Sequence, residues 1–201
     1  QRLSKERHEA CMNSKEAMKN IPFFNYPALF EQRKDEYLNI VQDVLSRGAY
    51  IMQQDLIDFE NDLAKYLGVK HAIGVADGTM ALLISLMAAG IGEGDEVIVP
   101  SHTFVASAAA IHHSGAKPVL ADCQEDHLID PNSISKLITS KTKAIMPVQL
   151  NGRVADMDAI NKIATKHDLI IIEDSCQALG AKYKNQFAGT FGLTGTFSFF
   201  P

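Results

Sequence analysis

The chain has 201 residues, and 46% of them are hydrophobic, which is enough to bury a core and suits one domain. The formal net charge is −5 and the Lys and Arg residues are scattered, which argues against a nucleic-acid surface. No apolar stretch approaches the ~20 residues of a membrane span and no secretory signal is visible, so we expect no membrane partner.

Cysteine use points to the cytoplasm. Cys11, Cys123 and Cys176 form neither a CxxC pair nor an even disulfide framework. Free thiols are typical of a reducing compartment, so we expect a cytoplasmic protein.

The first third of the chain predicts helices. Residues 1–20 are polar and charged, and we expect a helical or disordered lead-in there. Apolar residues then recur at helical spacing over 31–47 and over 53–67, and Gly68 ends the second of these helices.

From Val69 onward, short apolar runs alternate with helical stretches. The alternation predicts an α/β fold: a mostly parallel sheet with right-handed crossovers and helices on both faces. The chain ends within an apolar run, so we expect residues 21–201 to be one domain that is incomplete at its C-terminus. The predicted strands are 72–76, 96–99, 118–121, 144–148 and 169–172, and the predicted helices are about 79–90, 103–114, 132–139 and 156–167.

An acidic pair follows the most apolar of these strands. Leu169–Ile172 has the character of a strand buried on both faces, and Glu173 and Asp174 come directly after it. Ligands of open α/β sheets bind at this carboxyl end. Asp174 is therefore placed to meet a cationic ring nitrogen, as an aspartate does for the pyridinium of pyridoxal phosphate (PLP). Taken alone, such a residue is more often a helix N-cap or a loop acid.

Gly78 and Thr79 open a predicted helix at the same edge. Free backbone N–H groups and the helix dipole make such a turn suitable for a phosphate. The alternative is that Thr79 or Asp77 only caps the helix. The motif is neither GxGxxG nor GxxxxGK[ST], which removes the main support for a dinucleotide or triphosphate.

Other candidates lie on neighbouring loops of this edge. Phe104 could lie flat on a planar cofactor, although a core position is the alternative. Asn151 and Arg153 could reach a ligand, and Asp156 is a credible N-cap. The segment 195–199 predicts a strand with the hydroxyl of Ser198 pointing outward.

Metal and thiol chemistry find no support. His112 and His113 are consecutive, so on a helix they diverge and cannot chelate one metal. Cys176 has no neighbouring His or second Cys that would mark it as a nucleophile, and we expect a small buried residue.

The motifs GTMAL, GDEVIVPSHTFVASA, GAKPVLAD, GRVADMD, EDSCQALGA and GTFSFFP occur in this order. Together, over about 21–201, they resemble the sugar aminotransferases of the DegT/DnrJ/EryC1/StrS family. The resemblance implies the aspartate-aminotransferase fold (type I) and PLP as cofactor. It also implies that Asp174 pairs with the pyridinium nitrogen, that Phe104 stacks on the ring and that Gln177 lies near its phenolic oxygen.

The resemblance further assigns the phosphate to Gly78, Thr79 and Ser198. Family members carry a Schiff-base lysine five residues after the serine that matches Ser198, a position just beyond Pro201. Asn151 and Arg153 fall in the segment that borders the sugar site. This segment lacks the His and Tyr that the family often has there, so the resemblance does not name the sugar.

The implied reaction moves an amino group from glutamate to a nucleotide-linked keto-sugar, which yields an amino sugar for lipopolysaccharide or another glycan. The implied assembly is a homodimer. Two alternatives stay open: a pyridoxamine-dependent sugar dehydratase of the same family, with histidine in place of the lysine, and a truncated, non-catalytic relative.

Overall fold

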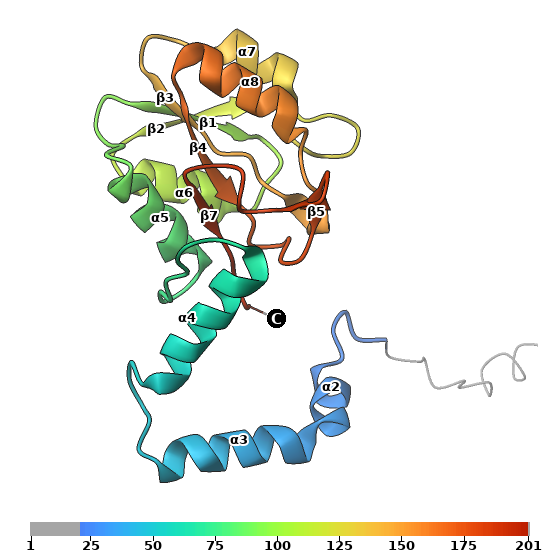
Figure 1. Cartoon of the computed structure of the whole chain (residues 1–201). Helices are drawn as coiled ribbons and strands as arrows, with labels where there is room; N and C mark the ends of the chain where they lie inside the picture. Colours follow the sequence, from blue (N-terminus) through green and yellow to red (C-terminus); the bar gives the residue numbers. More distant parts are fainter. Residues whose placement is uncertain (1–20, 201) are drawn as a thin grey trace, which may run out of the picture. The chain divides into compact units, whose positions relative to one another are not determined.

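The structure is a computed structural model that describes residues 21–200, so the predicted lead-in over 1–20 lies outside the described residues. The chain divides into two compact units with the boundary between Asp55 and Leu56 (Figure 1). The assignment of 21–201 to one domain stays a prediction. Among the described residues, no helix combines the length and the apolarity needed to cross a membrane.

The described part of the first unit is helical. It contains α2 (Tyr26–Gln32), α3 (Lys34–Ser46) and the start of α4 (Gln54–Leu67). The predicted helix over 31–47 is therefore interrupted, because Arg33 leaves helical geometry at φ −132°. Arg47 ties the segments together with ion pairs to Asp43 at 2.9 Å and Asp55 at 3.0 Å.

The second unit contains a five-stranded sheet with the order β2-β1-β3-β4-β7. Every pairing in this sheet is parallel, which confirms the predicted α/β fold. Parallel neighbours need crossover connections, and here helices supply most of them. The strands are β1 (Glu96–Pro100), β2 (Lys117–Ala121), β3 (Thr142–Ile145), β4 (Ile170–Asp174) and β7 (Thr194–Thr196).

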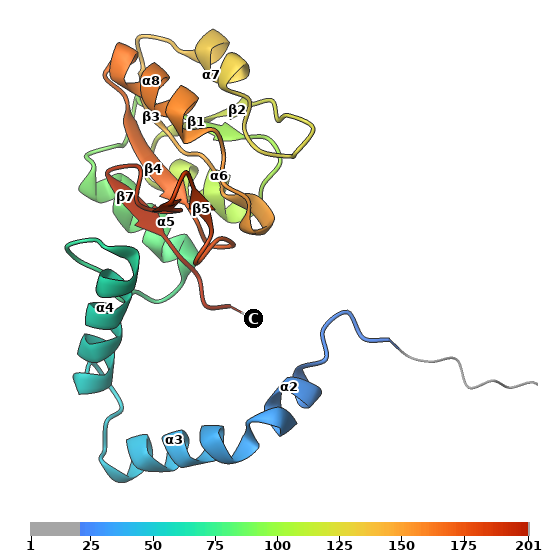
Figure 2. The same ribbon diagram turned by 45° about the vertical axis from the view of Figure 1, so that its right-hand side comes forward.

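Helices cover both faces of this sheet, as predicted. On one face α5 (Gly78–Ala88) packs against α6 (Val105–His113), and on the other α7 (Pro131–Leu137) packs against α8 (Met157–His167) (Figures 1 and 2). Aspartates accept a backbone N–H at the starts of α5, α7 and α8, which fixes where these helices begin. The core between the layers is aliphatic, with Ile98, Ile145 and Ile172 fully buried.

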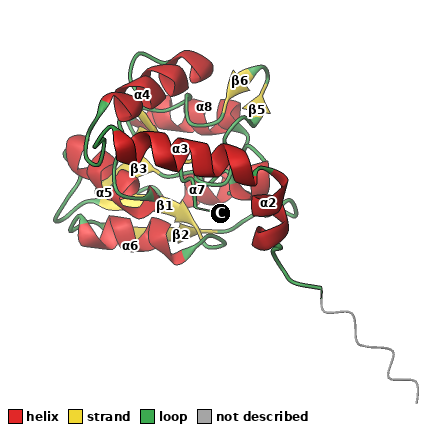
Figure 3. Ribbon diagram, turned by 90° about the horizontal axis from the view of Figure 1, so that it is seen from below, coloured by secondary structure: helices red, strands yellow, loops and turns green. Residues whose placement is uncertain are grey.

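Three details of the strands differ from prediction. The strand expected over 195–199 is β7, which ends at Thr196, so Ser198 lies beyond it. Residues 72–76 are not a strand: they form no ladder with any described residue, and Ile73 is 79% exposed. An apolar run becomes a strand only when a neighbour accepts its hydrogen bonds, and periodicity does not show whether one exists. The small hairpin of β5 (Lys182–Tyr183) and β6 (Gln186–Phe187) was not predicted. It lies beside the start of α8 (Figure 3), where Tyr183 Oη donates to Asp156 Oδ1 at 2.9 Å.

Candidate functional site at the carboxyl edge of the sheet

Asp174 ends β4 and is 6% exposed. Both carboxylate oxygens accept hydrogen bonds. Ser107 Oγ donates to Oδ2 at 2.7 Å, and the backbone N–H of Cys176 donates to Oδ1 at 3.3 Å. The carboxylate is thus held in one orientation at the edge of the sheet where ligands of this fold bind.

Ser107 brings the start of α6 to this carboxylate. It is fully buried, and its hydroxyl also lies 2.8 Å from Thr103 Oγ1. Since its single proton goes to Asp174, the Thr103 hydroxyl donates to it. Ser107 was not predicted as a site residue, although one turn of helix separates it from Phe104 and that spacing was the available signal.

Phe104 is the residue directly before α6, where its extended backbone precedes the first turn. Its side chain is 68% exposed, so the core alternative is wrong. An exposed ring at the start of α6, the helix that carries Ser107, is available for stacking on a planar group.

The start of α5 is the candidate cradle for an anion. Gly78 is buried, and a Cβ there would lie 2.8 Å from Cys176 Sγ and 3.2 Å from Ser198 Cβ. A side chain at this position would displace Cys176 or Ser198, so glycine keeps the backbone here open to a ligand. Asp77 caps the helix, because its Oδ1 accepts from Met80 N at 2.8 Å, which confirms the alternative that this residue is the N-cap. The N–H groups of Gly78 and Thr79 find no acceptor among the described residues, so they are free for a phosphate.

Ser198 follows β7 and stands beside Gly78, as the near contact of its Cβ shows. Its Oγ accepts from Phe200 N at 3.3 Å. The register places β7 against the end of β4, with Asp174 opposite Thr196. The structure therefore brings Gly78, Asp174 and Ser198, which the sequence separates widely, to one edge.

Cys176 lies close to Gly78 and Asp174, but its surroundings do not activate it as a nucleophile. Burial, and then the charge of Asp174, raises the pKa of its thiol to about 12. The side chain is half-buried and its Sγ is 3.8 Å from Thr196 Oγ1. The thiol therefore stays protonated at neutral pH, although the side chain is less buried than predicted.

The loop after β3 joins the site through Gln177. Gln177 Oε1 accepts from Asn151 N at 2.9 Å, and Asn151 has a left-handed backbone at φ 54°. Asn tolerates this conformation better than most residues. Arg153 is directed elsewhere: its guanidinium donates to the backbone oxygen of Asp126 at 3.0 Å.

The described residues contain no group of three or more His, Cys, Asp or Glu side chains that could hold a metal ion. The rings of His112 and His113 are 5.8 Å apart and tilted by 55°.

The fold is α/β, and the carboxyl edge of its sheet carries the buried carboxylate of Asp174 and the glycine-led start of α5, with the exposed Phe104 directly before α6. The chain belongs to the DegT/DnrJ/EryC1/StrS aminotransferase family, whose model matches residues 31–201.

Curated relatives agree with this assignment. The chain is 43% identical over 183 residues to the "Pleiotropic regulatory protein" of Geobacillus stearothermophilus, covering 90% of this chain and 49% of that protein. It is 41% identical over 191 residues to dTDP-3-amino-3,4,6-trideoxy-alpha-D-glucose transaminase of Streptomyces venezuelae, covering 94% of this chain and 50% of that protein. The chain thus spans about half the length of these relatives.

Solved structures agree as well. The crystal structure of DesV from S. venezuelae superposes with a TM-score of 0.86 at 42% identity, over 90% of this chain and 49% of that one. Spr1654 from Streptococcus pneumoniae, solved in a PLP form, superposes with a TM-score of 0.78 at 34% identity, over 81% of this chain and 46% of that one.

Proposed function

We propose that the chain is the cofactor-binding part of a PLP-dependent aminotransferase that transfers an amino group from glutamate to a nucleotide-linked keto-sugar. The observation that carries the proposal is the convergence of Asp174, Gly78 and Ser198 at one sheet edge. A carboxylate at one end and free helix N–H groups at the other match the two charged ends of PLP.

The residues present fit this cofactor. Asp174 would pair with the pyridinium nitrogen, and Phe104 would stack on the ring. Gly78, Thr79 and Ser198 would hold the phosphate. The buried glycine supports this assignment, because a side chain there would close the cradle. When bound, PLP supplies an electron sink for bonds at the amino carbon of the substrate.

The chain's own groups then have separate tasks. The Asp174 carboxylate would keep a proton on the ring nitrogen, and the Ser107 hydroxyl holds that carboxylate in place at 2.7 Å. Gln177 would lie near the phenolic oxygen. Its hydrogen bond from Asn151 N supports placing the loop that carries Asn151 beside the cofactor, where the sugar would bind. The Arg153 guanidinium would contact the substrate only after its hydrogen bond to the backbone oxygen of Asp126 is broken.

Several parts of the proposal concern the whole protein. The Schiff-base lysine would follow Ser198 by five residues, beyond Pro201. The product would be an amino sugar for lipopolysaccharide or another glycan. The relative from S. venezuelae, named as a dTDP-amino-sugar transaminase, supports a nucleotide-linked substrate.

A cytoplasmic homodimer completes the proposal. The free thiols of Cys123 and Cys176 support a reducing compartment. Large apolar side chains that stay exposed on α2 and α3 support self-association; they are Leu29, Phe30, Leu38, Val41 and Leu45. Analytical ultracentrifugation of the full-length protein tests the dimer, and a monomer at micromolar concentration would count against it.

Absorption spectroscopy of the purified full-length protein tests the function. We expect a band near ~420 nm that bleaches when glutamate is added, the behaviour of a PLP–lysine chromophore that accepts an amino group. The dehydratase alternative predicts cofactor binding without stable amination of the keto-sugar. The non-catalytic alternative, to which the relative named as a regulatory protein gives some weight, predicts no glutamate-dependent bleaching. A protein with no affinity for PLP would contradict the proposal.

A further inference from the structure

Glu173 has the least exposed side chain of any acid among the described residues, at 0%. It precedes Asp174 on β4, and alternation along a strand sends the two side chains to opposite faces. Asp174 bonds to α6, whereas Glu173 bonds to Gln149 and to the turn before β7. The cofactor proposal gives Asp174 a task but leaves its neighbour without one.

Four donors converge on the Glu173 carboxylate. Oε1 accepts the backbone N–H groups of Phe191 at 2.6 Å and Gly192 at 3.0 Å. Oε2 accepts the N–H of Gly189 at 2.9 Å and the Nε2 of Gln149 at 3.0 Å. Each oxygen thus has two donors, which fully satisfies a buried carboxylate. Burial raises the pKa of Glu173 and these hydrogen bonds oppose that rise.

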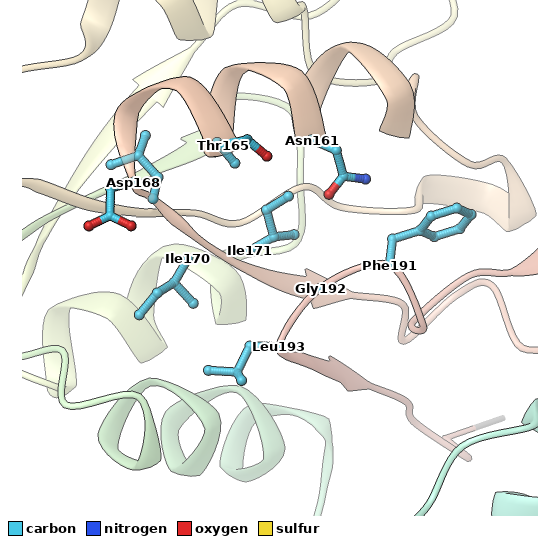
Figure 4. A pocket seen from close by; sticks show the side chains of 10 residues that line it. Asn161, Thr165, Asp168, Ile170, Ile171, Phe191, Gly192 and Leu193 are labelled. Atoms are coloured by element: carbon cyan, nitrogen blue, oxygen red, sulfur yellow. The ribbon is translucent and has the colours of Figure 1, made fainter.

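Three of these donors belong to one backbone segment, residues 189–192, which we call the 189–192 turn. The turn packs directly on β4: a Cβ at Gly192 would collide with the carbonyl of Ile171, and Leu193 N donates to that carbonyl at 2.8 Å. Figure 4 shows Gly192 and Leu193 running beside Ile170 and Ile171. The turn also folds back on its own continuation, since a Cβ at Gly195 would collide with Gly189.

The 189–192 turn leads straight into β7, and β7 leads to the phosphate cradle. In the ladder Glu173 pairs with Gly195 and Asp174 with Thr196. Thr196 Oγ1 donates to the carbonyl of Glu173 at 3.1 Å. Two residues later comes Ser198, beside Gly78. The carboxylate therefore anchors the incoming end of the strand whose outgoing end reaches the cradle.

Gln149 extends the same anchor to the loop after β3. Its Oε1 accepts from Ala155 N at 2.8 Å, and its own N–H donates to the carbonyl of Asp174 at 2.8 Å. The Glu173–Gln149 pair thus connects β4, β7 and the segment that carries Asn151, with no contact to solvent.

We propose that Glu173 is a positioning residue that, through the 189–192 turn and β7, fixes Ser198 beside Gly78 where the cofactor phosphate would bind. Consecutive residues of β4 then control the two ends of one ligand, Asp174 its ring and Glu173 its phosphate site. The inference rests on the proposed function, because it needs PLP in this site.

The test compares Glu173→Gln with Glu96→Gln in the full-length protein. Gln keeps the volume of Glu, but its NH₂ group faces donors and leaves at least one of the N–H groups of the turn unpaired. Glu96 is a matched control, since it is 8% exposed, begins β1 at the opposite edge of the sheet and bonds to Thr139 Oγ1 at 2.7 Å. Urea unfolding of the cofactor-free proteins measures stability, PLP titration measures affinity, and ³¹P NMR reports the surroundings of the bound phosphate.

We expect both variants to lose stability, but only Glu173→Gln to lose about tenfold or more in PLP affinity and to shift the ³¹P resonance. Equal PLP affinities and unchanged ³¹P resonances in the two folded variants would overturn the positioning role and leave the proposed function intact. A wild-type protein that does not bind PLP would overturn both.

Hydrogen exchange of the wild-type protein keeps the proposal testable if Glu173→Gln fails to fold. We expect the amides of Gly189, Phe191 and Gly192 to exchange as slowly as those of β4, with or without PLP. Exchange at the rate of an exposed loop would refute the anchor. The Glu173→Asp variant, which keeps the charge but is shorter by one methylene, should fold and show an intermediate PLP affinity. Wild-type PLP affinity in Glu173→Asp would show that the carboxylate does not need the full length of the Glu173 side chain to hold the 189–192 turn.

Discussion

The hydroxyl of Ser107 lies 2.7 Å from Oδ2 of Asp174, in a pair that joins α6 to the end of β4 with both residues buried. This bond connects the group that would meet the cofactor ring with the helix that follows Phe104. A hydrogen bond to a charged group stabilises a protein by about 1.5–3 kcal/mol. The contact thus contributes both to the fold and to the orientation of the carboxylate.

Ser107→Ala should lower the free energy of unfolding by about 1–3 kcal/mol and weaken PLP binding, because Asp174 loses its buried donor. Urea unfolding and PLP titration measure the two effects. Ser133→Ala is the matched control: Ser133 is buried on α7, where its Oγ accepts from Asp122 N at 2.9 Å. It should lose stability and keep PLP affinity. Equal PLP affinities in the two variants would show that Ser107 does not orient the carboxylate.

Asp174→Asn should leave the fold in place and reduce amination on the order of 10²-fold or more, because the neutral amide no longer stabilises the ring proton. Steady-state kinetics with glutamate and the keto-sugar measure the loss, and circular dichroism checks the fold. Asp168→Asn is the control at the other end of the strand, since Asp168 ends α8 in a left-handed conformation at φ 54° that Asn adopts readily. Unchanged turnover in Asp174→Asn would remove the role assigned to it.

Sequence patterns were sufficient for the parallel sheet and most helices because apolar runs and caps are local signals. The site residues Asp174, Gly78 and Ser198 could be predicted only from the order of the family motifs, because no local pattern shows that these residues lie at the same edge of the sheet. Ser107 and Gln149 were missed because a buried serine or glutamine resembles any core neighbour until its partner is known. The run 72–76 was misread for the same reason: its pairing depends on distant residues.

Gly78→Ala should cost stability and close the cradle. The added Cβ would lie 2.8 Å from Cys176 Sγ, closer than atoms pack without displacement. Overpacking of this kind costs about 1–3 kcal/mol, and the shift would move the free N–H groups away from a phosphate. We expect weaker PLP binding by titration. Gly90→Ala at the end of α5, where nothing lies within 4 Å but φ is +72°, should reduce stability only. Wild-type PLP affinity in Gly78→Ala would contradict the cradle.

Cys176 should resist alkylation in the folded protein. A pKa raised from 9.0 to about 12 lowers the thiolate fraction at pH 8 by about 10³-fold, and the thiolate is the reactive form. Mass spectrometry after iodoacetamide treatment should find Cys176 unmodified in buffer and modified in 8 M urea, a concentration of the order used to unfold domains completely. Rapid modification in buffer would mean that the thiol is neither buried nor held beside Asp174.

Glu96 should make stability depend on pH in the acid range. The Thr139 hydroxyl, and then Lys117, holds the pKa of Glu96 below its ordinary value of 4.5. A carboxyl group with a lowered folded-state pKa stabilises the protein above its unfolded-state pKa, and this contribution is lost as pH falls through the folded-state pKa. The difference in unfolding free energy between wild type and Glu96→Gln should therefore be constant above about pH 5.5 and shrink as pH falls below 4.5. Lys117 is 72% exposed, so its ion pair with Glu96 contributes little and is screened by salt. The Thr139 bond contributes most of the difference, so added salt should reduce the difference only slightly. A difference that grows toward low pH would reverse the assigned direction of the pKa shift.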